Sequence, residues 1–105
     1  MLKKKLGIEA IEKGWRNSGD VNDYFKIPST LIIPEGCEKI GDSIFRGGLK
    51  NLRKVVVPES VEEIGRNAFD WCWRTTIILK KPMSKFIVGE FAFWECEDVK
   101  EGIRS

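Results

Sequence analysis

Ile64-Gly65-Arg66-Asn67-Ala68-Phe69 decides the fold of this chain, because the sequence repeats it. The other two versions, each displaced by 24 residues, are Ile40-Gly41-Asp42-Ser43-Ile44-Phe45 and Val88-Gly89-Glu90-Phe91-Ala92-Phe93. The same step separates Pro34, Pro58 and Pro82. A fixed period of this length is typical of stacked structural repeats, in which each unit buries its apolar face against its neighbours. The phrase therefore predicts the architecture, although it names no reaction.

Each repeat also carries a short β-branched run before its proline. The runs are Leu31-Ile32-Ile33, Val55-Val56-Val57 and Ile77-Ile78-Leu79. Such residues favour strands, and we expect the strands to pair in parallel along the array and to end at the prolines, which lack an amide donor. Alternation predicts an inward set of Leu31, Ile33, Val55, Val57 and Leu79, and an outward set of Thr30, Ile32, Lys54, Val56, Ile78 and Lys80. We expect the phenylalanines of the phrase to stack in the core, and its glycines to have a positive φ or a close backbone contact.

The second repeat reads Leu52-x-x-Val55-x-Val57-Pro58-x-x-Val61-x-x-Ile64-Gly65-x-x-Ala68-Phe69-x-x-Cys72. This pattern resembles the BspA-like (Treponema-type) leucine-rich repeat, whose signature is LxxLxLPxxLxxIGxxAFxxC, and the likeness extends over about residues 29–99. It implies an α+β solenoid, namely a short right-handed leucine-rich-repeat solenoid of three 24-residue coils with a parallel sheet. Arrays that the pattern resembles are usually displayed at bacterial cell surfaces or found in parasites, and we expect a bacterial or phage source. At the 24-residue step, Lys81 takes the place of the apolar Val57.

The two ends of the chain depart from the repeat. Residues 1–28 hold apolar residues at helical spacing, and we expect an N-terminal helical cap and loop there, followed by the repeat domain over 29–105. A helix that contacts a membrane or a partner is the alternative. Ile103 follows Leu79 by 24 residues, so residues 102–105 are either a fourth strand or a frayed tail. An uncapped strand edge is a pairing site, which predicts a possible homodimer through the C-terminal edge.

Composition limits the chemistry that we expect. The chain has 105 residues, a net charge of +2 and no histidine. Without histidine, the cysteines have no imidazole to act as a base, so we expect no catalytic residues and no cofactor. Three scattered cysteines are also too few for a four-ligand zinc site, so we expect no metal site. Cys72 and Cys96 lie one repeat apart, so they are either buried thiols that alkylate slowly or a disulfide between adjacent coils. The basic start is not followed by an apolar signal-peptide stretch, and no apolar run could span a membrane, so we expect a cytoplasmic protein.

Two surfaces are candidates for binding another protein. The outward strand residues would form the concave face on which leucine-rich repeats commonly dock partners, with Ile32, Val56 and Ile78 as an apolar stripe beside Lys54 and Lys80. The second candidate is the turn after the phenylalanine, where Trp71, Trp73 and Trp94 gather near Arg74, because tryptophan and arginine are frequent in binding hot spots. In both cases the residues could instead serve the fold alone, as strand formers or as rings that close the core edge.

Two other functions stay open from the sequence. One is a small inhibitor, possibly encoded by a phage or mobile element, that blocks a larger complex. The other is single-stranded nucleic-acid binding through a basic side with aromatics nearby. That side would comprise Lys50, Arg53, Lys54, Arg74, Lys80, Lys81 and Lys85. Nucleic-acid binding is disfavoured because 16 acidic residues nearly balance 18 basic ones.

Overall fold

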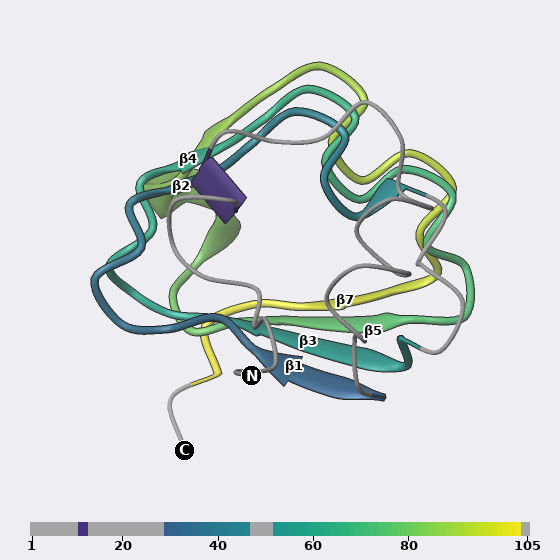
Figure 1. The fold of residues 1–105 in the computed structure, drawn as a ribbon, viewed down its shortest axis with the longest axis horizontal. Coiled ribbons are helices and arrows are strands. Elements are labelled where there is room, and N and C mark those ends of the chain that lie inside the picture. The colour runs from purple at the N-terminus through teal and green to yellow at the C-terminus, as the bar shows by residue number, and fades with distance from the viewer. Residues whose placement is uncertain (1–10, 13–28, 47–51, 104–105) are drawn as a thin grey trace, which may run out of the picture.

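The strands in the described part of the chain form two parallel sheets that face each other across the core (Figure 1). The computed structural model describes residues 11–12, 29–46 and 52–103. The large sheet has the strand order β1 (Thr30–Ile32), β3 (Lys54–Val57), β5 (Thr76–Leu79) and β7 (Asp98–Lys100). The small sheet has the order β2 (Lys39–Ile40), β4 (Glu63–Ile64) and β6 (Ile87–Val88). A 3₁₀ helix, η2 (Met83–Lys85), precedes β6. The predicted parallel pairing of the strands is confirmed.

The repeat length differs between the two sheets. In the small sheet Ile40 pairs with Ile64 and Ile64 with Val88, which keeps the 24-residue step of the phrase. In the large sheet Thr30 pairs with Lys54 at the same step, but Lys54 pairs with Thr76 and Thr76 with Asp98, each 22 residues on. The prediction of three 24-residue coils is therefore wrong for the later strands.

Burial of apolar side chains explains the shorter step. Ile77 lies beside Val55 and Leu79 beside Val57, and all four are fully buried. A 24-residue register would have brought the charged Lys81 into the core, where an unpaired ammonium is costly. The fourth strand follows the same shift: it is β7, which precedes residues 102–105, where the sequence had left a fourth strand and a frayed tail as alternatives. The amide of Ile103 still donates to the Leu79 carbonyl at 3.1 Å.

The core lies between the sheets and contains the predicted inward strand residues. The rings of Phe45 and Phe69 stack with centroids 5.4 Å apart, and those of Phe69 and Phe93 with centroids 5.5 Å apart, so the predicted ladder is confirmed. A Cβ on Gly65 would lie 2.8 Å from the Ile40 carbonyl oxygen, and one on Gly89 would lie 2.6 Å from the Arg66 amide nitrogen. These glycines therefore allow close contact between coils, and neither has a positive φ.

The predicted N-terminal helical cap lies outside the described residues, apart from Ile11 and Glu12. Ile11 is fully buried, and its carbonyl accepts a hydrogen bond from the Gly41 amide at 2.7 Å. The Glu12 carboxylate accepts one from the Glu38 amide at 2.8 Å. These two residues thus cover the β2 end of the small sheet. Within the described ranges, no helix is long and apolar enough to cross a membrane.

Candidate interaction surfaces

The outer face of the large sheet carries an apolar row, which we define as Ile32, Val56 and Ile78. The strand register pairs Ile32 with Val56 and Val56 with Ile78, so the three side chains lie side by side on adjacent strands. Ile32 is 67% exposed, while Val56 and Ile78 are half-buried. Lys100 continues the row on β7. The structure therefore brings together the three apolar residues that the sequence assigned to this face.

Polar side chains form a second row on the same face, two residues before the apolar row on each strand. It runs from Thr30 through Lys54 and Thr76 to Asp98. The Thr76 hydroxyl donates to the Asp98 carboxylate at 2.8 Å, and the Lys100 ammonium lies 3.2 Å from its other oxygen. The hydrogen bond from Thr76, and after it the contact with Lys100, lower the pKa of Asp98. The remaining predicted residue, Lys80, follows β5 and is half-buried, with its amide bonded to the Val57 carbonyl at 3.0 Å.

A second surface is an aromatic cluster, which we define as Trp71, Phe91 and Trp94. The Trp94 ring contacts Trp71 edge-on with centroids 5.2 Å apart, and it contacts Phe91 with centroids 6.0 Å apart. All three rings are exposed, as is Trp73. Trp73 instead carries the Arg74 guanidinium, whose central carbon lies 4.5 Å from the ring centroid. The predicted residues Trp71, Trp73 and Arg74 therefore do not form one group: Trp71 contacts Trp94, and Arg74 contacts Trp73.

Phe91 is a member of this cluster that the sequence analysis did not identify as a site residue. Its φ is 59° and that of Trp71 is 62°, in the left-handed region that bulky side chains rarely occupy. Ser43 and Asn67 hold the position of Phe91 in the other two phrases, with similar φ values. Because the other two phrases have small polar residues at this position, the phenylalanine is the feature of the sequence that could have identified this surface.

A buried carboxylate lies next to Trp71 in the chain. Asp70 is 1% exposed, and its carboxylate accepts a hydrogen bond from the Asn67 side-chain amide at 2.7 Å. Its other oxygen lies 3.3 Å from the Arg46 guanidinium of the preceding coil. Buried charges in proteins are normally paired in this way. These contacts fix the turn that presents Trp71 to solvent.

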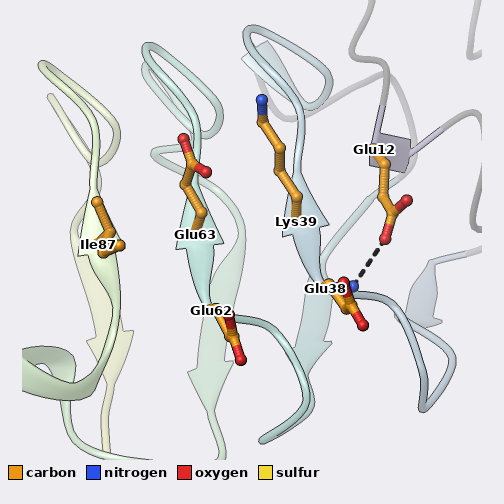
Figure 2. A pocket seen from close by; sticks show the side chains of 6 residues that line it. All are labelled: Glu12, Glu38, Lys39, Glu62, Glu63 and Ile87. Carbon is orange, nitrogen blue, oxygen red and sulfur yellow. Dashed lines mark hydrogen bonds between the residues drawn. The ribbon is translucent and has the colours of Figure 1, made fainter.

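A third surface is an acidic groove on the outer face of the small sheet, with a volume of about 320 Å³. Its lining comprises Glu12, Glu38, Lys39, Glu62, Glu63 and Ile87 (Figure 2). Lys39, Glu63 and Ile87 lie in one row across β2, β4 and β6. The sequence analysis did not select this face. No group of side chains in the described parts of the chain could hold a metal ion.

The cysteines occupy the same slot in successive coils. The Cys72 thiol donates to the Phe45 carbonyl at 3.1 Å, and the Cys96 thiol donates to the Phe69 carbonyl at 2.9 Å. Both are free, so the disulfide alternative is not what the structure shows. Cys96 is only half-buried, and its hydrogen-bonding contact with Cys72 lowers the pKa of its thiol. The expectation that Cys96 alkylates slowly is therefore revised, since exposure and a lower pKa both favour reaction.

The repeats agree with a known family. The family model described as BspA type leucine rich repeat region (6 copies) matches residues 24–103. The chain belongs to this family. Comparison with curated proteins finds no match, and comparison with solved structures finds none. Leucine-rich repeats of this family usually mediate protein interactions, so the match supports a binding role in general terms and identifies no partner.

Proposed function

We propose that this BspA-type repeat protein is a non-enzymatic protein-binding module, and that its apolar row is the recognition surface. The observation that carries the proposal is the register of the large sheet. It aligns Ile32, Val56 and Ile78 on a face that no described element covers. Aligned apolar side chains on an open sheet face are typical of interaction sites when polar residues surround them.

Charge around the apolar row suggests the chemistry of the partner. Lys54 lies beside the row, Lys80 follows it on β5, and Lys100 ends it. Asp98 is the one acidic residue in the paired strand positions of this face, and it is engaged by Thr76 and Lys100. The surface therefore fits a protein with an apolar patch bordered by carboxylates. Complementary rim charges of this kind increase the association rate and help to select the partner.

The test removes the apolar area and keeps the strands. Replacing Ile32, Val56 and Ile78 by threonine preserves β-propensity, and at these surface positions it should change the free energy of unfolding by less than about 2 kcal/mol. Partners captured from native lysate with the wild-type chain are identified by quantitative mass spectrometry and then titrated in purified form. We expect the triple variant to weaken the binding of a partner so identified at least about tenfold.

Ile87→Thr is the matched control, because Ile87 is 70% exposed on the outer face of the small sheet. It should leave the affinity unchanged. A control that weakens binding as much as the triple variant would place the interface elsewhere.

The aromatic cluster is a second candidate surface for the same function. Its specific support is the residue type at Phe91, because an exposed aromatic ring there takes a left-handed position that Ser43 and Asn67 hold in the other phrases. Changing Trp71, Phe91 and Trp94 to serine tests this cluster in the same assay. If this variant loses the partner and the threonine variant does not, the aromatic turns are the interface. Cytoplasmic action and homodimerisation both stay predictions.

A further inference from the structure

The C-terminal end of the repeat stack exposes residues that are buried in the earlier coils. Val88 is 40% exposed, whereas Ile40 and Ile64 at the same position are fully buried. Phe93, Cys96 and Val99 are likewise only partly buried and pack against the core from one side. This end therefore presents core side chains to solvent.

Backbone amides at this end lack partners within the described part of the chain. In the second coil the amides of Asn67, Phe69 and Trp71 donate to the carbonyls of Glu90, Ala92 and Trp94, at 2.8–3.0 Å. The corresponding amides of the third coil belong to Phe91, Phe93 and Glu95, and among the described residues they have no acceptor. An open strand edge next to apolar side chains is a template for pairing with another chain.

Among the described strands β7 is an edge of the large sheet, and its hydrogen-bond pattern can be worked out from β5. The amides of Thr76 and Lys80 donate toward β3, and the carbonyl of Leu79 accepts from Ile103 on the β7 side. Alternate residues of a parallel strand bond to opposite neighbours. Asp98 and Lys100 therefore bond to β5, which leaves the amide and carbonyl of Val99 directed at the free edge.

We propose that a second copy of this chain pairs with β7, antiparallel and centred on Val99. Across the two-fold axis, the two Val99 residues would exchange both hydrogen bonds of one antiparallel pair. Asp98 of each copy then lies opposite Lys100 of the other, so the outward charges of β7 are self-complementary. Opposite charges in directly facing positions stabilise such a pair. Glu97 would face Glu101 of the second copy, and this repulsion limits the pairing to β7 and makes the dimer reversible.

The opposite end of the stack fits less well as the partner surface. Ile11 accepts the Gly41 amide there, and Glu12 accepts the Glu38 amide. Head-to-tail stacking of copies would compete with these contacts, whereas β7 pairing leaves them intact. The dimer would join the two large sheets into one continuous sheet. The apolar rows of both copies would then lie on the same side, which suits a bivalent partner.

Charge reversal provides a test of the register. Analytical ultracentrifugation of the whole chain should show a concentration-dependent dimer. Asp98→Lys gives two positive charges on β7 and Lys100→Asp gives two negative ones, so each variant alone should dimerise at least about tenfold more weakly. Mixing the two variants restores opposite charges in both facing positions, and a heterodimer should form. Lys54→Asp makes the same charge change on an interior strand and should dimerise like the wild type.

Val99→Pro tests the strand pairing independently. Proline removes the amide that points to the free edge and leaves the bonds between β5 and β7 in place. We expect loss of the dimer with a cooperative thermal transition retained, as followed by circular dichroism. The proposal is overturned if the wild type stays monomeric up to near-millimolar concentration, or if Val99→Pro dimerises normally. It is also overturned if the mixed charge variants stay monomeric, because that result excludes the register centred on Val99.

Discussion

Deletion of the Phe69 ring is the most informative test of how the coils are held together. The ring is fully buried and stacks on Phe45 at 5.4 Å and on Phe93 at 5.5 Å. Replacement of a buried phenylalanine by alanine costs about 3–5 kcal/mol. Each stacked pair contributes about 0.5–1.5 kcal/mol beyond the area that it buries, so Phe69→Ala should fall in the upper part of that range.

The comparison with Phe93 sharpens this prediction. Phe93→Ala removes one stacked pair and a ring that is already partly exposed, so it should cost at least about 1 kcal/mol less than Phe69→Ala. Urea denaturation followed by tryptophan fluorescence measures both free energies of unfolding. Since small domains have about 5–15 kcal/mol of stability in total, Phe69→Leu serves as a milder variant that retains most of the apolar volume. Equal losses for Phe69→Ala and Phe93→Ala, or a loss below about 1 kcal/mol for Phe69→Ala, would refute the ladder as the centre of the core.

Three further predictions concern single contacts. Under native conditions iodoacetamide should modify Cys96 before the buried Cys72, as read by peptide mass spectrometry; the reverse order would contradict the lowered pKa of Cys96. Thr76→Val should raise the pKa of Asp98 toward its ordinary value of 3.8. The wild type should therefore be the more stable above that value, and its advantage should shrink as the pH falls through the lower pKa of the folded state; a pH-independent difference in melting temperature would contradict this. Gly65→Ala should cost about 1–3 kcal/mol in urea, because its Cβ would meet backbone atoms of the preceding coil, and a neutral effect would contradict that contact.

The sequence predicts most of this fold because its repeats are self-consistent. The 24-residue step of the phrase predicts the pairing of Ile40, Ile64 and Val88, and alternation within the strands predicts the side chains of the apolar row. In the large sheet the step holds from β1 to β3 but fails at β5 and β7, because two requirements compete there. Keeping the proline in phase would place Lys81 in the core, and the chain instead buries Leu79 and lengthens the connection that precedes β6.

The candidate surfaces are less predictable, because they depend on how the turns orient their side chains. A tryptophan after the phrase can close the core or face solvent, and only the backbone at Trp71 and the ring contacts of Trp94 distinguish these outcomes. The contacts of Ile11 and Glu12 with the first coil could not be predicted either, because these residues lie outside the repeat.

Site-specific photo-crosslinking tests the central claim, that the apolar row is the recognition surface, most directly. A photoreactive side chain placed at Ile32 probes the row, and the same group at Ile87 probes an equally exposed position on the other sheet. After irradiation in native lysate, the account predicts one predominant crosslinked protein from the Ile32 position. It also predicts that the threonine changes at Val56 and Ile78 abolish this crosslink. A crosslink to the same protein that forms equally well from Ile87, or one that survives those threonine changes, would contradict it.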